Sequence, residues 1–336
     1  MKFLVASLIA LSTVSAVSII PGDNTGYVEG VSRYIWMPDG NEVPHLVDLR
    51  APVNATLLET RRTWRSRNGN DNQYWLYTRE NRENYQLLWN GDLNSVRNSY
   101  YDPNRPTKVI AHGWNNAGTS DINLYVKNAF LDVEDCNVIV VDWNVLSASD
   151  YITAVEGVPS VGRYLGNFLI WLFDNVGGSY DQLHLVGHSL GAHVVGAAGR
   201  QIGGRARRVT GLDPAGPLWL TSKDAINLDS GVLVEAIHTD GGVLGIYERV
   251  GHIDFYPNGG INPQPGCLIS TCSHSRSYYL FAASIRYNHF IGRQCSSMFQ
   301  VYWNQCSGSN LNMGNADLTK TGYGMYRVDT DSIWPF

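Results

Sequence analysis

The stretch LHLVGHSLGAHVVGAAGRQIGG, residues 183–204, decides the fold. Its first four residues form an apolar run typical of a buried strand, and small or apolar residues typical of a helix packed closely on a sheet follow Ser189. The pentapeptide at 187–191 matches G-x-S-x-G, in which a sharp strand-to-helix turn presents a serine. A side chain on Gly187 or Gly191 would collide with the neighbouring strand and helix. The strand before the motif and the helix after it favour a catalytic serine over a purely structural turn.

Other apolar runs along the chain predict further strands. They lie at residues 107–111, 137–141, 209–212 and 232–237, and helices are predicted at 162–175 and 192–201. Apolar strands that alternate with helices indicate an α/β fold with a mostly parallel central sheet and helices on both faces. Ligands bind at the carboxyl ends of the strands in such sheets, so catalytic residues are expected there.

A serine nucleophile requires a general base, and the base requires a carboxylate that fixes its tautomer. In folds with this motif the order along the chain is serine, acid, histidine. Five histidines follow the serine: His193, His238, His252, His274 and His289. We expect His274 to be the base because a short disulfide would fix its loop, whereas the other four suit structural positions better. Asp213 and Asp240 each follow a predicted strand, and spacing favours Asp213 with Asp240 as its rival.

The first 70 residues are predicted to contain a targeting segment followed by an irregular segment. Residues 1–16, MKFLVASLIALSTVSA, predict a secretory signal peptide, with a buried N-terminal helix as the alternative. Residues 17–70 lack clear periodicity and contain four prolines, which predicts a pro-segment or an irregular N-terminal arm. Residues 71–336 would then form the catalytic domain. Asn54-Ala55-Thr56 is an N-glycosylation sequon, a weak signal because such tripeptides often stay unused.

Five cysteines fit a secreted protein, in which disulfides can form. Proximity favours the pairs Cys267–Cys272 and Cys295–Cys306 among three possible connectivities. Cys136 lies beside an apolar run and is predicted to be a small buried hydrophobic residue rather than a reactive thiol.

Composition excludes several classes of protein. The 336 residues are 44% hydrophobic and 16% charged, which argues against a disordered chain or a coiled coil. The net charge of −5 argues against a nucleic-acid binder, which needs a basic excess. After the signal peptide, no apolar window is long enough to predict a transmembrane helix.

With these residues in hand, the chain from Tyr74 onward resembles the pancreatic-lipase family of secreted α/β-hydrolases. It looks closest to insect members, which include wasp-venom phospholipases A1 and yolk-protein relatives. The motifs that carry the resemblance occur in order: AHGW at 111–114, VDW at 141–143, GHSLGAH at 187–193, GLDPAGP at 211–217, IHTDGG at 237–242, GHIDFYPNGG at 251–260 and CSHSRS at 272–277.

The resemblance implies a role for each candidate residue. Ser189 would be the nucleophile and His274 the base. Asp213 would be the acid rather than Asp240, because the family acid lies in the G-L-D-P-A motif. The backbone N–H groups of Leu190 and Trp114 would form the oxyanion hole, and Leu190 is expected from the strand-to-helix turn itself. No cofactor is expected.

Departures from the family pattern refine these expectations. The chain ends 30 residues after Cys306, so a single domain without the C-terminal β-sandwich, and no dependence on colipase, are expected. Asp224 and Asp229 look like remnants of a calcium-binding loop with an incomplete ligand set, so no metal is predicted. Only residues 268–271 separate Cys267 from Cys272, too few for an amphipathic helix that covers the site. The loop at 241–250 also looks short.

Short versions of both loops resemble the A1-type phospholipases. We therefore predict a secreted, extracellular esterase that removes the sn-1 acyl chain of phospholipids at a membrane or micelle surface. Triacylglycerol lipase and galactolipase are the alternatives within the same chemistry. A yolk-protein-like lipid-binding or storage protein is the non-enzyme rival, and the presence of both Ser189 and His274 argues against it. The oligomeric state is left open.

Overall fold

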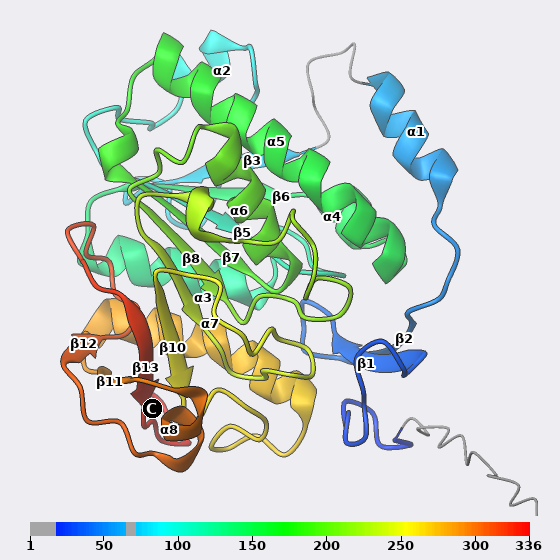
Figure 1. Cartoon of the computed structure of the whole chain (residues 1–336). Coiled ribbons are helices and arrows are strands. Elements are labelled where there is room, and N and C mark those ends of the chain that lie inside the picture. Colours follow the sequence, from blue (N-terminus) through cyan, green and yellow to red (C-terminus); the bar gives the residue numbers. More distant parts are fainter. Residues whose placement is uncertain (1–17, 65–71) are drawn as a thin grey trace, which may run out of the picture.

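A sheet of eleven strands organises the part of the chain that the structure describes. The computed structural model describes residues 18–64 and 72–336 (Figure 1). The sheet has the order β12-β11-β13-β10-β9-β8-β7-β5-β6-β3-β4. Its strands are β3 (Gln73–Tyr77), β4 (Gln86–Leu88), β5 (Thr107–Ala111), β6 (Asn137–Asp142), β7 (Leu183–His188), β8 (Arg208–Leu212), β9 (Val234–Ile237), β10 (Ile253–Pro257), β11 (Ile291–Cys295), β12 (Asn310–Asn312) and β13 (Gly324–Val328).

The middle of this sheet is parallel and its edges are antiparallel. Every pairing from β6 through β5, β7, β8, β9 and β10 to β13 is parallel, while β3, β4, β11 and β12 pair antiparallel. The predicted fold class, an α/β-hydrolase domain with a mostly parallel sheet, is therefore confirmed. No C-terminal β-sandwich occurs within residues 72–336.

Helices cover both faces of the sheet because alternate strand residues point to opposite faces. In β5, Val109 packs with α5 (Tyr151–Asn175) and α6 (Leu190–Gln201), whereas Ile110 packs with α3 (Asp121–Val133) and α7 (Ser270–Tyr287). Shorter helices complete the chain: α1 (Ala55–Trp64), α2 (Leu93–Arg97), α4 (Asn144–Ser147) and α8 (Met298–Trp303), with 3-10 turns at Tyr180–Gln182 and Leu228–Ser230. None of the helices described is long and apolar enough to cross a bilayer.

The N-terminal segment differs from the expectation of an irregular arm. Strands β1 (Tyr34–Pro38) and β2 (Pro44–Asp48) form an antiparallel hairpin, with Ile35 and Val47 buried in the main core. Asn54 is exposed, and its Oδ1 accepts the N–H of Leu57 at the start of α1. The predicted signal peptide and the boundary at residues 70–71 lie outside the described residues.

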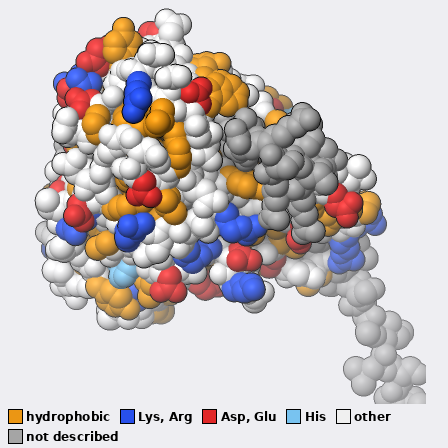
Figure 2. All heavy atoms as spheres, turned by 90° about the horizontal axis from the view of Figure 1, so that it is seen from above, with side chains coloured by type: hydrophobic (Ala, Val, Ile, Leu, Met, Phe, Trp, Pro, Cys, Tyr) orange, Lys and Arg blue, Asp and Glu red, His pale blue; other side chains and the backbone are white. Residues whose placement is uncertain are grey.

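Figure 2 looks onto the face of the molecule at the top of Figure 1. Lys and Arg side chains are interspersed there with Asp and Glu rather than gathered in one stripe. This face therefore presents mixed charge to solvent.

Candidate active site

Ser189 lies in a strained turn between β7 and α6. Its backbone has φ 56° and ψ −125°, a region that non-glycine residues rarely adopt. The flanking glycines make the turn possible. A Cβ on Gly187 would lie 2.1 Å from the Gly191 oxygen, and a Cβ on Gly191 would lie 2.2 Å from the Ala111 oxygen. Close packing of strand, turn and helix therefore holds Ser189 at the amino end of α6.

His274 and Asp213 form a buried pair at the same end of the sheet. Asp213 directly follows β8, and its Oδ2 accepts a 2.6 Å hydrogen bond from Nδ1 of His274. The second oxygen, Oδ1, accepts the backbone N–H groups of Thr239 and Asp240 at 2.7 and 3.1 Å. The carboxylate thus has partners on both oxygens and orients the imidazole. The structure corrects one expectation: His274 is the fifth residue of helix α7, not part of a loop.

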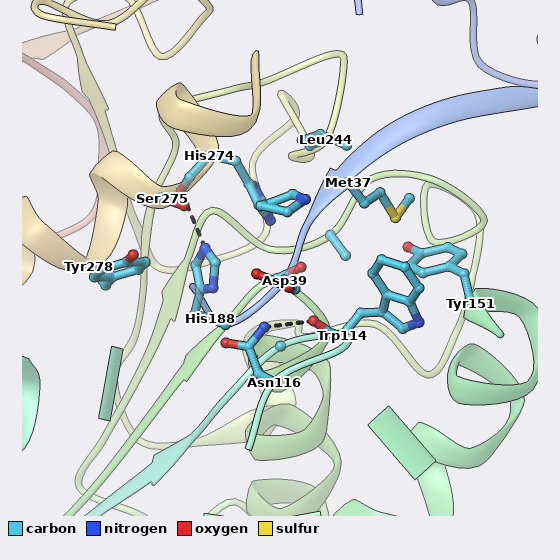
Figure 3. A pocket seen from close by; sticks show the side chains of 15 residues that line it. Met37, Asp39, Trp114, Asn116, Tyr151, His188, Leu244, His274, Ser275 and Tyr278 are labelled. Carbon is cyan, nitrogen blue, oxygen red and sulfur yellow. Dashed lines mark hydrogen bonds between the residues drawn. The ribbon is translucent and has the colours of Figure 1, made fainter. Parts of the chain in front are cut away.

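Ser189 and His274 line one pocket, together with Gly113 and Trp114 (Figure 3). A Cβ on Gly113 would lie 3.5 Å from Ser189 Oγ, so the turn after β5 lies directly against the serine. Within the described residues, no direct hydrogen bond joins the hydroxyl to the His274 ring. Such bonds are often long in unliganded enzymes and shorten when substrate binds.

Asp240, the rival acid, lies beside Asp213, and among the described residues no hydrogen bond joins its carboxyl to the imidazole ring. Its Oδ2 accepts bonds from Ser270 Oγ at 2.6 Å and from the Leu244 N–H at 3.0 Å. Burial, and then the charge of Asp213, raise the pKa of Asp240 well above its ordinary value. A raised pKa disfavours the charged form that would stabilise an imidazolium, and it is Asp213 that bonds the ring, so Asp213 is favoured for that task.

His188, which precedes the serine, is a residue that the sequence did not single out. Its Nε2 donates to the backbone oxygen of His274 at 3.2 Å (dashed in Figure 3). Burial, and then the nearby His274, lower the pKa of His188 well below its ordinary value, so it is neutral. His188 thereby ties the turn of α7 that carries His274 to the end of β7. The position of His188 inside the G-x-S-x-G motif was the one sequence feature that could have pointed to a role near Ser189.

The four other histidines that follow Ser189 lie outside the pocket that holds Ser189 and His274. His193 donates to the Ala215 oxygen at 2.9 Å, and burial lowers its pKa to about 3. His238 lies 3.1 Å from an oxygen of Asp254 and is fully buried. His252 accepts the N–H of Val234 at 3.0 Å, and His289 is exposed.

The expected oxyanion donors lie at adjoining strand ends. Strands β5 and β7 pair in register, with Ala111 opposite Gly187, which brings the residues after both strands together. Within the described residues, the backbone N–H groups of Trp114 and Leu190 have no hydrogen-bond acceptor. The Trp114 indole N–H donates to the Ser149 oxygen at 2.9 Å, which fixes its ring at the pocket wall.

The cysteines pair as proximity suggested. Disulfides join Cys267 to Cys272 and Cys295 to Cys306, and the first ties the residues just before α7 to the first turn of that helix. Cys136 is free and buried, and burial raises the pKa of its thiol to about 12. The described residues contain no cluster of His, Cys, Asp and Glu side chains that could hold a metal ion.

Comparisons with known proteins agree with this architecture. The model of the family described as Lipase matches residues 47–330, and the match begins within the segment predicted to be an arm. Mouse pancreatic triacylglycerol lipase is 36% identical over 276 residues, which cover 72% of this chain and 59% of the mouse protein. Rat pancreatic lipase-related protein 2 is 35% identical over 264 residues, covering 70% of this chain and 56% of the rat protein. This chain therefore spans less than two thirds of the length of these relatives.

Among solved structures, an acetyl xylan esterase from Aspergillus awamori aligns with a TM-score of 0.32 and 10% identity, over 53% of this chain and 71% of the esterase. Est1E from Butyrivibrio proteoclasticus aligns with a TM-score of 0.31 and 11% identity, over 52% of this chain and 77% of Est1E. The family match extends over most of the chain and includes the strained serine and the buried histidine–aspartate pair. The chain belongs to the lipase family.

Proposed function

We propose that this protein hydrolyses carboxylic esters of lipids through an acyl-enzyme on Ser189. The observation that carries the proposal is the 2.6 Å bond from His274 to Asp213 in the pocket that also holds the strained serine. An imidazole oriented by a buried carboxylate is the group that activates a serine hydroxyl at neutral pH.

In the proposed mechanism, Nε2 of His274 accepts the proton of the Ser189 hydroxyl while Oγ attacks the acyl carbonyl. The negative charge that develops on the carbonyl oxygen is stabilised by the N–H groups of Leu190 and Trp114. Asp213 stabilises the imidazolium and keeps Nδ1 protonated. His274 then gives its proton to the leaving alcohol and later activates the water that releases the acyl group.

The proposed substrate is a phospholipid cleaved at its sn-1 ester. The support is the disulfide between Cys267 and Cys272, which leaves only residues 268 and 269 before α7 begins at Ser270, too few for a further helix that would cover the pocket. Triacylglycerols and galactolipids remain the alternative substrates, and one relative is named as a triacylglycerol lipase. Two disulfides fit the proposed extracellular location.

The experiment compares the wild-type protein with Ser189→Ala on a soluble short-chain ester. Loss of the nucleophile should remove essentially all turnover, whereas Ser309→Ala, an exposed serine in the C-terminal part, should keep it. A serine-directed phosphonate should label wild-type protein and not the Ser189→Ala variant. Full activity in Ser189→Ala would refute the proposal.

Rates on phosphatidylcholine and triolein then decide the substrate class. A higher rate on phosphatidylcholine supports phospholipase A1 activity, provided that the free fatty acid comes from the sn-1 position. A much higher triolein rate would favour a triacylglycerol lipase. Lipid binding without turnover would indicate the storage-protein alternative.

A further inference from the structure

The tip of the β1–β2 hairpin forms one wall of the pocket that contains Ser189. Met37, Pro38, Asp39 and Gly40 line this pocket with Ser189, His274 and Trp114. Figure 3 shows Met37 near Trp114 and Tyr151, and Asp39 between that aromatic pair and His188. A segment that sequence analysis assigned to an arm thus reaches the proposed catalytic residues.

Gly40 joins the hairpin to the loop that carries the proposed oxyanion donor Trp114. Its N–H donates to the Asn115 oxygen at 3.1 Å. The contact leaves no space for a side chain, because a Cβ on Gly40 would lie 2.0 Å from Ser120 Oγ and 2.8 Å from Ser120 Cβ. The hairpin tip is therefore packed directly against the 113–120 loop.

This loop has little regular structure of its own to hold it. Asn115 adopts a left-handed φ of 51°, and its N–H donates to the Ser147 oxygen at 2.7 Å. The side chain of Asn116 donates to the Trp114 oxygen at 2.6 Å. The loop is thus fixed from α4 on one side and from the hairpin on the other.

The same hairpin also contacts the helix that carries His274. The hydroxyl of Tyr278 donates to Glu42 Oε1 at 2.6 Å. Tyr278 follows His274 by four residues, so the two side chains share a face of α7. Upstream of the hairpin, the side chain of Asn24 donates to Ser270 Oγ, in the first turn of α7, at 3.1 Å. The hairpin therefore connects the loop that carries Trp114 with the helix that carries His274, two parts of the site whose spacing must be kept.

The hairpin is well suited to hold this spacing. Its strands pair over five residues, and Ile35 and Val47 anchor it in the core. The Asp39 carboxylate closes the turn by accepting the N–H groups of Asn41 and Val43 at 2.9 and 3.0 Å. A loop that rests on a rigid element keeps its donors aimed more precisely than an unsupported loop.

We propose that the β1–β2 hairpin is a positioning element of the active site: Gly40 fixes the loop that carries Trp114, and Glu42 fixes α7 relative to that loop. The assignment rests on the proposed esterase function for its kinetic consequence. It needs no contact between the hairpin and the reacting atoms.

The decisive variant is Gly40→Ala, whose methyl group would push the hairpin away from Ser120. Turnover on a soluble short-chain ester should fall on the order of ten- to a hundredfold in kcat, with KM changed far less, because misplaced donors weaken transition-state binding. Amide hydrogen exchange should speed up in residues 113–120. Asn41→Ala, at an exposed position of the same turn, is the matched control and should retain kcat and exchange rates.

A compensating change separates positioning from general damage to the fold. Ser120→Gly removes the two closest atoms that the new methyl group would meet and leaves Asn116 Cγ at 3.3 Å, so Gly40→Ala combined with Ser120→Gly should recover kcat relative to Gly40→Ala alone. Ser120→Gly by itself is measured as the reference, because Ser120 Oγ accepts the Ala117 N–H within the same loop. At the other contact, Glu42→Gln keeps an acceptor for Tyr278 and should retain kcat, whereas Glu42→Ala should lower it.

The hydrogen-exchange measurement uses no substrate, so it tests the positioning role of the hairpin independently of the proposed esterase function. Unchanged exchange in residues 113–120 of a folded Gly40→Ala variant would overturn the proposal, as would wild-type kcat in that variant. If the wild-type protein did not hydrolyse esters, that result would instead count against the proposed function.

Discussion

At the scale of single residues, two neighbouring buried aspartates have different environments. Asp213 accepts a hydrogen bond from His274, while Asp240 bonds Ser270 and Leu244. We expect Asp213→Asn to lower kcat about 10⁴-fold, because an amide cannot stabilise the imidazolium or hold the required tautomer. Asp240→Asn should lower kcat less than tenfold by comparison, and ester hydrolysis assays on both variants check this. Equal losses of kcat in the two variants would make Asp240 a candidate for the catalytic acid again.

The raised pKa of Asp240 also makes a prediction about stability. The folded protein keeps a proton on Asp240 at pH values where the unfolded chain has released it. The free energy of unfolding should therefore fall as pH rises above the ordinary aspartate range, up to the raised pKa. Asp240→Asn removes this titration, so urea unfolding between pH 4 and pH 7 should show a smaller decline than in wild type. An unchanged decline would contradict the assigned protonation state.

At the scale of elements, the strand–turn–helix around Ser189 depends on glycine at fixed positions. Gly187→Ala would place a methyl group 2.1 Å from a backbone oxygen that cannot move without displacing α6. We expect it to destabilise the protein by about 3 kcal/mol or more and to abolish ester hydrolysis. Gly203→Ala is the comparison: it has a left-handed φ of 76° but no neighbour within 4 Å, so about 1–2 kcal/mol is expected. Denaturant unfolding of both variants checks the order.

The same elements show what the sequence could and could not predict. Buried parallel strands are continuous apolar runs, so β5, β6, β7 and β8 were predicted close to their observed bounds, and β9 begins only two residues later than expected. The hairpin was missed because its short strands contain Pro38 and Pro44, and because its turn is held by a long-range bond from Gly40 to Asn115 that the sequence does not show. His274 was predicted to lie in a loop fixed by a disulfide, whereas it lies in α7, whose first turn is held by long-range bonds of Ser270 to Asp240 and Asn24 that the sequence does not show.

At the scale of the whole molecule, the two ends of the sheet carry different polar groups. The carboxyl ends of β7 and β8 lead into Ser189 and Asp213, while the opposite ends of β8 and β9 carry a fully buried pair, Arg208 and Glu235. The C-terminal segment supplies Lys320, whose Nζ lies 2.8 Å from Glu235 Oε1. Burial raises the pKa of Glu235, but the charges of Arg208 and Lys320 outweigh burial and lower it. The proposed catalytic residues and the contacts that attach the C-terminal segment therefore lie at opposite ends of these strands.

This separation predicts that a substitution in the buried cluster around Glu235 changes the free energy of unfolding without changing turnover. Glu235→Ala leaves two buried cations without their counter-charge, so the free energy of unfolding should fall by about 3–5 kcal/mol. Arg33→Ala, which removes an exposed ion pair with Asp48, should cost less than about 1 kcal/mol. Because Glu235 lies at the far end of the strands from Ser189, kcat per folded molecule should stay near the wild-type value in both variants. Wild-type stability in Glu235→Ala would show that the buried cluster does not anchor the segment that carries Lys320. A folded Glu235→Ala variant with reduced kcat would show that this anchor is not separate from the active site.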